Sequence, residues 1–263
     1  MGYRAFVLAI SLTLIFANVV VVPAAEPVAS VECPDPQPPL VTDFAVYQTP
    51  DFPEPAARTP FRVYDRRTDR VVATRDLRHW PDALREFDSV TISPLGTYFL
   101  ASFDAYCEVG QLGSDDQPCG LMVYDRDLEN GRSLLRIVGH SDVALDAEGR
   151  EVLVYQDIDI DRISMLDLAS GEVTPLWPID FSPTPIGLHF SGRAFGLPGW
   201  ALVSTHDGDP ASYTWMDDQV FAIELKPGGR VVRFAHTHAL VDETQEHDYW
   251  AEPHASVNQD FTR

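Results

Sequence analysis

Hydrophobic and polar positions follow one recurring plan along most of the chain after residue 60. A short apolar segment ends in an acidic or polar residue, a turn follows, and a second apolar segment returns. Inside these segments the apolar side chains keep a two-residue period, as at Val152 and Val154 or at Phe221 and Ile223. β-Branched and aromatic residues dominate, and this combination is typical of strands. The pattern predicts an all-β domain built from hairpins.

The hairpins fall into two series that alternate along the chain. The first series comprises FRVYDRRTDRVVATR, LMVYDRDLENGRSLLRI, ISMLDLASGEVTPLW and VFAIELKPGGRVVRF. The second comprises SVTISPLGTYFLASF, DVALDAEGREVLVYQ, GRAFGLPGWALVSTH and the shorter ASVNQDFTR. A pair of hairpins occupies roughly 40 to 60 residues, which is the spacing of four-stranded propeller blades. We therefore expect a β-propeller of four-stranded antiparallel blades. Residues 89–93, 142–146 and 255–259 would be its inner strands.

About four blades can be counted, which is fewer than most closed propellers use. The last hairpin ends at NQDFTR without a returning strand. The expectation is an incomplete propeller over residues 61–263, truncated at its C-terminal end. The clearest helical pattern is WPDALREF, residues 80–87, which we interpret as a short helix between blades.

The first 60 residues differ from the rest. Residues 5–22 are almost wholly apolar and are followed by VPAAE, the layout of a secretory signal. We predict a signal peptide over residues 1–25, with an uncleaved anchor as the alternative because the apolar segment is long. After cleavage no membrane span is expected. Residues 26–60 hold many prolines and no hairpin, so they are interpreted as a leader.

Export makes the cysteines informative, because oxidising compartments allow disulfides to persist. Cys107 and Cys119 enclose a Gly- and Asp-rich loop, CEVGQLGSDDQPC, whose ends can meet. We predict a disulfide between them, and two free thiols are the alternative. Cys33 lies in the Pro-rich leader and is interpreted as a free thiol. The expected location is the periplasm or the extracellular space.

The formal net charge of −21 argues against nucleic acid and anionic lipid as partners, since both require a basic face. Cations and neutral ligands are compatible with it, and so is a solvated acidic surface without a specific role. Neither a Gly-x-Ser-x-Gly nucleophile turn nor a phosphate-binding Gly-rich loop occurs in the sequence.

The SPLG and DAEG turns resemble those of Tol-translocation-type and WD-repeat-like bacterial propellers, over roughly residues 60–263. The sequence is also similar to exported propellers related to oligogalacturonate lyases, through its His-x-His at residues 236–238. Arg233 stands where those lyases carry a glutamine. This second resemblance implies a divalent metal held by histidines near the propeller axis.

Three other histidines hold near-equivalent positions before the turns of the second series. His140 and His254 each precede an aspartate by six residues, and His189 lies one position further back. Equivalent inner-strand residues of successive blades face one axis, so these imidazoles are expected to converge. Asp142 or Glu252, two residues from a histidine, could add an oxygen ligand. The sequence thus predicts one site for Mn, Zn or Ca. The alternative is that the histidines only donate hydrogen bonds in the channel.

Two functions from different classes follow. The first is an exported binding scaffold that presents its wide face to a protein, peptide or glycan. The second is a metal-assisted lyase acting on polyuronide oligosaccharides, with Arg193 as the basic residue near its site. The acidic charge opposes a polyanionic substrate.

Overall fold

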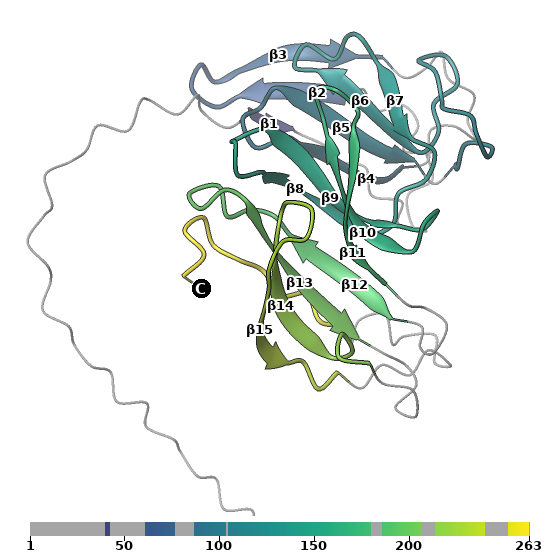
Figure 1. Ribbon diagram of the computed structural model, residues 1–263. Coiled ribbons are helices and arrows are strands. Elements are labelled where there is room, and N and C mark those ends of the chain that lie inside the picture. The colour runs from purple at the N-terminus through teal and green to yellow at the C-terminus, as the bar shows by residue number, and fades with distance from the viewer. Residues whose placement is uncertain are drawn as a thin grey trace, which may run out of the picture. The chain divides into compact units, whose positions relative to one another are not determined.

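The computed structural model describes seven stretches of the chain: residues 40–42, 61–76, 87–103, 105–179, 186–206, 214–239 and 252–262. Fifteen strands run through these residues (Figure 1). None of the described residues is helical, so the all-β prediction is confirmed. Among them there is accordingly no helix with the length and apolar character needed to cross a membrane.

The strands form one three-stranded and three four-stranded antiparallel sheets. The first sheet contains β1 (Leu40–Thr42), β2 (Phe61–Asp65) and β3 (Arg70–Arg75). The second contains β4 (Phe87–Ile92), β5 (Tyr98–Phe103), β6 (Leu121–Asp125) and β7 (Arg132–Leu135). The third contains β8 (Ser141–Leu145), β9 (Glu151–Asp157), β10 (Arg162–Asp167) and β11 (Val173–Pro178). The fourth contains β12 (Gly187–Ser191), β13 (Trp200–His206), β14 (Gln219–Glu224) and β15 (Val231–His236).

In every sheet the strand order follows the chain, so each sheet is a meander of hairpins. The first-series hairpins are β2–β3, β6–β7, β10–β11 and β14–β15, and the complete second-series hairpins are β4–β5, β8–β9 and β12–β13. The predicted alternation of two hairpin series is therefore confirmed. The four sheets correspond to the expected blades of an incomplete propeller-like arrangement.

Alternation within the central strands gives the second and third sheets two buried faces. In β9, Val152 and Val154 belong to one hydrophobic core, whereas Leu153 and Tyr155 belong to another. Because the side-chain period is two, a strand between two layers contributes its odd and even residues to different cores.

Three cores connect the sheets in chain order. The first core joins β2 to β5 and β6 through a group of aromatic and aliphatic residues: Phe61, Val63, Phe99, Ala101, Phe103, Met122 and Tyr124. The second joins the opposite face of β5 and β6 to the third sheet through Leu100, Leu121, Val123, Val143, Leu153 and Tyr155. The third joins the third and fourth sheets through Val152, Val154, Ile163, Leu188, Ala201, Val203 and Phe221. Successive sheets thus pack face to face as blades do.

The first strands of neighbouring sheets also meet. β1 contacts β4, and β8 contacts β12, as expected for the inner strands of adjacent blades. The predicted inner strands, residues 89–93 and 142–146, overlap β4 and β8, except that each observed strand begins earlier and ends one residue earlier. Each lies at the edge of its sheet.

The turn that ends β8 is fixed by one carboxylate. Asp146 is fully buried. Its Oδ1 accepts hydrogen bonds from the backbone N–H groups of Glu148 and Arg150 at 3.0 and 2.8 Å. Gly149 supplies the left-handed conformation, with φ of 77°. The DAEG turn is therefore built locally by its own sequence, which explains why such turns mark blades without indicating an activity.

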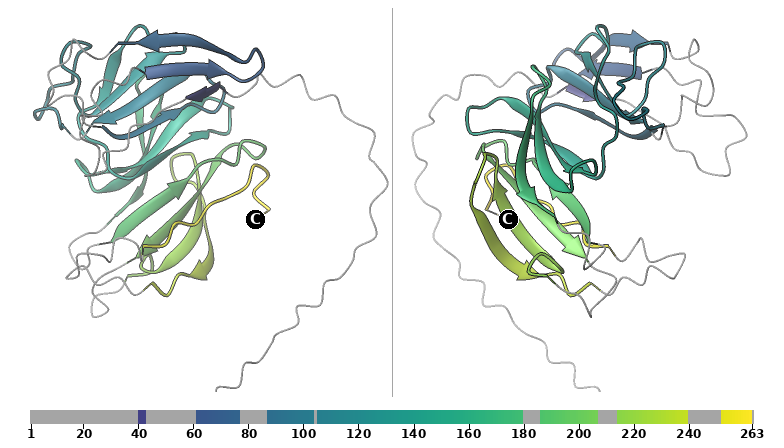
Figure 2. Two further views of the ribbon diagram at one scale, coloured as in Figure 1. Left: turned by 180° about the vertical axis from the view of Figure 1, so that it is seen from behind. Right: turned by 45° about the vertical axis from the view of Figure 1, so that its right-hand side comes forward.

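The prediction for residues 255–259 was wrong, because this segment is not a strand. The backbone N–H groups of Ala255 and Val257 donate to side-chain hydroxyls, those of Ser204 and Ser191, at 3.1 and 3.2 Å. These serines belong to β13 and β12, so the segment lies across the face of the fourth sheet rather than in a ladder. Figures 1 and 2 show it in yellow beside that sheet.

The predicted signal peptide lies outside the described residues. Most of the predicted leader does as well, but its residues 40–42 form β1 and pair with β2. The helix predicted over residues 80–87 also falls outside them, except for Phe87, which belongs to β4.

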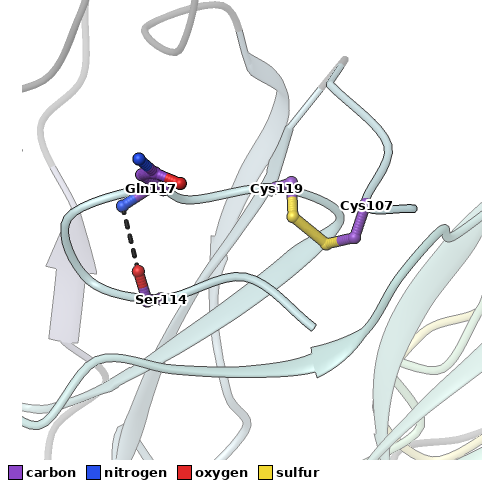
Figure 3. The surroundings of a disulfide bond; sticks show 4 residues. All are labelled: Cys107, Ser114, Gln117 and Cys119. Atoms are coloured by element: carbon purple, nitrogen blue, oxygen red, sulfur yellow. Dashed lines mark hydrogen bonds between the residues drawn. A yellow bond between two sulfur atoms is a disulfide. The ribbon is translucent and has the colours of Figure 1, made fainter. Parts of the chain in front are cut away.

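The predicted disulfide between Cys107 and Cys119 is present (Figure 3). It closes a loop that extends the β5–β6 hairpin, with Phe103 N–H donating to the carbonyl of Gly120 at 2.8 Å. Within the loop, the backbone N–H of Gln117 donates to the hydroxyl of Ser114 at 3.2 Å. Cys107 N–H donates to the carbonyl of Arg136, the residue after β7, at 2.9 Å, which ties the loop to the outer strand of the second sheet.

Candidate metal site on the fourth sheet

The candidate site lies on the face of the fourth sheet that does not pack on the third. The register pairs Gly187 with His206, His189 with Ser204 and Ser191 with Leu202. Directly paired residues point to the same side of an antiparallel sheet. One face of β12 and β13 therefore carries His189 and His206 together with two serines and Leu202.

Residues 252–262 cover this face. The hydroxyl of Ser204 donates to the carbonyl of Pro253 at 2.7 Å and accepts from Ala255 N–H at 3.1 Å. Further along the segment, Val257 packs on Ala194 and Leu202 in a small hydrophobic core that also includes Ala255. Apolar burial and backbone hydrogen bonds thus fix the segment, and the segment brings Glu252 and His254 onto the sheet.

Three side chains place possible ligand atoms close together. One ligand atom from each of His189, Glu252 and His254 lies within 4.8 Å of the other two. Nε2 of His189 is 2.7 Å from Oε2 of Glu252. The imidazoles of His189 and His254 are in ring contact, with centroids 3.7 Å apart. In the described part of the chain this is the one group of His, Cys, Asp and Glu with such geometry.

His140, the residue before β8 of the third sheet, joins the same cluster. Its ring stacks on that of His189 with centroids 4.4 Å apart. Its Nδ1 lies 2.6 Å from the carbonyl oxygen of Leu188 and, facing an acceptor, must be the donor. The structure therefore gathers all three sequence-predicted histidines, but the compact set of ligand atoms contains Glu252 in place of His140.

His189 is neutral at pH 7. Burial is the main cause that lowers its pKa to about 4, the hydrogen bond to Glu252 opposes the shift, and the neighbouring His140 and His254 add to it. Since Nε2 faces a carboxylate oxygen, it carries the ring proton. A neutral imidazole is the form that binds metal ions.

His206 was not among the predicted site residues. Its Nε2 lies 3.7 Å from Oε2 of Glu252, and its ring is 6.1 Å from that of His189. The ring is buried opposite Gly187, where a β-carbon would overlap the imidazole. The sequence signal was available in part, because His206 ends the second-series hairpin that begins after His189. Its closeness to His189 follows from the strand register, which pairs His206 with Gly187.

Asp142 and Arg193 form a separate contact between β8 and the end of β12. Oδ2 of Asp142 accepts from Gly192 N–H at 3.0 Å and from Arg193 Nε at 3.3 Å. Its other oxygen accepts from Val143 N–H at 2.9 Å. Burial raises the pKa of Asp142, and the Arg193 charge and these hydrogen bonds oppose the rise. Neither residue belongs to the group of possible ligand atoms.

His236 and His238 lie elsewhere on the fourth sheet, at and beyond the end of β15. Their rings stack at 5.5 Å, and Nδ1 of His236 is 2.7 Å from Nε2 of Gln219. The His-x-His pair is therefore not part of the cluster around His189.

No protein-family model and no curated protein matches the chain. Solved structures with partial similarity include proteins described as auxiliary nutrient binding proteins, from Bacteroides ovatus (14% identity, TM-score 0.37) and Bacteroides thetaiotaomicron (11%, 0.39). Each alignment covers 69% of this chain and 38% of that protein. Hydrazine synthase of Kuenenia stuttgartiensis aligns over 77% of this chain and 53% of its own, at 15% identity and a TM-score of 0.36. The chain thus spans well under two thirds of these proteins, and at such TM-scores the alignments carry no argument about function.

Proposed function

We propose that this protein is an exported ligand-binding scaffold of propeller type, in which His189, Glu252 and His254 hold one divalent ion, zinc or manganese. The observation that carries the proposal is the spacing of their ligand atoms, all within 4.8 Å of one another. Two imidazoles and one carboxylate are a ligand set found in catalytic and substrate-facing zinc sites.

The electrostatics of the cluster support binding of a cation. The His189 side chain is only 10% exposed and that of Glu252 only 14%, so little water screens the carboxylate. Burial lowers the pKa of His189 to about 4, so the ring is already neutral and has one unprotonated nitrogen; an ion bound at Nε2 would displace the proton that Glu252 accepts. An ion bound to three protein donors retains open coordination positions, and a ligand with oxygen donors could occupy them. The ion would thereby contribute directly to ligand recognition.

The export part of the proposal is supported by the disulfide, since such bonds persist in oxidising compartments. The ligand, a protein, peptide or glycan, would bind beside the cluster, where His254 is exposed. Polyuronide lyase activity is the weaker proposal. A lyase needs a base and a cationic group for the substrate carboxylate, and the Arg193 guanidinium already pairs with Asp142.

Isothermal titration calorimetry of the metal-free full-length protein with zinc, and separately with manganese, tests the proposal. The expected result is one ion per chain, with affinity reduced at least tenfold in Glu252→Gln and in His254→Ala. Loss of one protein ligand out of three removes a large share of the coordination energy. His238→Asn is the matched control, because His238 is exposed and has a positive φ of 51°, which asparagine tolerates.

His140→Ala separates the two possible ligand sets. If Glu252 completes the set, this variant keeps the stoichiometry and most of the affinity. Equal affinity of all four variants and the unchanged protein would contradict the metal site. The histidines would then serve only as packed hydrogen-bonding residues.

A further inference from the structure

A pocket opens at one end of the fourth sheet, and it is separate from the histidine cluster. It has a volume of about 310 Å³ and is lined by residues that include Thr214, Asp217, Asp218, Gln219, Arg233 and His236. This volume is at the lower end of the range for small-molecule pockets, about 300 to 1,000 Å³. The pocket is therefore suited to one small ligand unit.

Gln219 organises the wall of this pocket. It is 2% exposed, and its Oε1 accepts from Nε and Nη2 of Arg233 at 3.1 and 2.9 Å. Because the guanidinium only donates, these contacts fix which end of the amide is oxygen. Nε2 of Gln219 then donates to the carbonyl of Asp217 at 3.0 Å and to Nδ1 of His236 at 2.7 Å. All hydrogen-bonding capacity of the amide is used inside the protein, so its role is to hold its neighbours.

The orientation of Gln219 determines the state of His236. An Nδ1 that accepts a hydrogen bond carries no proton, so the proton of the neutral ring is on Nε2. His236 is exposed and lines the pocket. It therefore offers an N–H donor to a ligand there.

Asp218 supplies the complementary acceptor. It is 9% exposed, and its Oδ1 is buried without a hydrogen-bond partner among the described residues. An unsatisfied buried carboxylate oxygen is costly, and a ligand hydroxyl that donates to it removes that cost. Its φ of 53° is the left-handed conformation that few residues other than Asp, Asn and Gly adopt readily.

The wall carries charges of both signs. The Arg233 guanidinium opposes an ammonium group and the carboxylates of Asp217 and Asp218 oppose an anion, so no single ligand charge is favoured by all of these groups. Arg233 is held in place by Gln219 and by the Trp215 ring, whose centroid lies 5.9 Å from the guanidinium carbon. A fixed donor beside a fixed acceptor matches the hydroxyl group, which both donates and accepts.

We propose that this pocket binds one neutral sugar unit, with a hydroxyl donating to Asp218 and another accepting from His236. It lies on the same sheet as the histidine cluster, but it needs no metal. The pocket and the ion site are therefore tested by different measurements, and a negative result for one does not contradict the other.

Saturation-transfer NMR followed by calorimetry on the metal-free full-length protein tests this inference. The probes are the methyl glycosides of glucose, galactose, mannose, xylose and N-acetylglucosamine, together with glucosamine and glucuronate as cationic and anionic counterparts. At least one neutral glycoside should bind, and more tightly than either charged sugar. Asp218→Asn should weaken it at least tenfold, the loss expected when a hydrogen bond to a charged group is removed.

Two further variants keep the result interpretable. His236→Ala removes the N–H donor at an exposed residue and should also weaken binding, so the test does not depend on a single buried substitution. Asp88→Asn, at an exposed carboxylate of β4, should leave binding unchanged. Binding of none of the sugars, preference for a charged one, or equal affinity in the unchanged protein, Asp218→Asn and His236→Ala would overturn the inference.

Discussion

Removal of the Cys107–Cys119 disulfide is the perturbation whose cost can be worked out most directly from the structure. We consider the double variant Cys107→Ala/Cys119→Ala. The half-cystines are separated by 12 residues, and Cys107 is only 5% exposed. The loop is anchored at both ends by backbone hydrogen bonds, from Phe103 to Gly120 and from Cys107 to Arg136.

The magnitude follows from the restriction that the cross-link places on the unfolded chain. For a closed loop of this size the chain-entropy relation gives about 3 kcal/mol at 25 °C. Domains of ordinary stability unfold with about 5 to 15 kcal/mol, so this loss is a large fraction of the total. Since the anchored loop continues the β5–β6 hairpin, it must open when the second sheet unfolds. The loss should therefore be visible in the main unfolding transition.

Urea unfolding followed by tryptophan fluorescence measures the free energy of unfolding. The double variant should lose about 3 kcal/mol. The unchanged protein with its disulfide reduced should behave like the double variant, and Cys33→Ala should match the oxidised protein. An identical free energy of unfolding with and without the disulfide would refute the reasoning. It would mean that the loop opens independently of the sheets.

Two further predictions concern the fourth sheet. A hydrogen bond from Lys226 is the main cause that lowers the pKa of Glu224 from its ordinary value of 4.5 to about 2, and hydrogen bonds from Arg230 add to the shift. The stability that Glu224 contributes relative to Glu224→Gln should therefore be present above pH 4.5 and be lost as the pH falls through 2. A difference that does not shrink between pH 4.5 and a pH below 2 would contradict this. Gly187→Ala should displace the His206 ring beside Glu252 and weaken zinc binding in calorimetry, whereas unchanged affinity would exclude that coupling.

The fold was largely predictable because it is encoded by local patterns. The two-residue period at Val152 and Val154 identifies a strand, and turns such as Asp146 to Gly149 are built by their own side chains. Ladder pairing of consecutive hairpins then follows from short connections. The strand predicted at residues 255–259 was wrong because an alternating pattern does not show which groups the backbone N–H groups of a segment will bond. Here the partners are the hydroxyls of Ser191 and Ser204 rather than a neighbouring backbone.

The site was predictable only in part because it depends on contacts between distant segments. Aligning the turns was sufficient to group His140, His189 and His254; the ring of His189 contacts the rings of the other two. Glu252 was placed by spacing alone. His206 reaches the cluster through the pairing of Gly187 with the end of β13, and that register is set by the whole sheet. The packing of residues 252–262 on Leu202 has no local sequence signature.

The central claim is that His189, Glu252 and His254 together hold one divalent ion. The most direct measurement is a crystal structure of the zinc-soaked protein with anomalous scattering recorded at the zinc absorption edge. The account predicts one strong anomalous peak with these three side chains as its protein ligands, at about 2.0 to 2.2 Å from nitrogen and oxygen. A map without a peak at this cluster, in crystals that contain zinc, would contradict it.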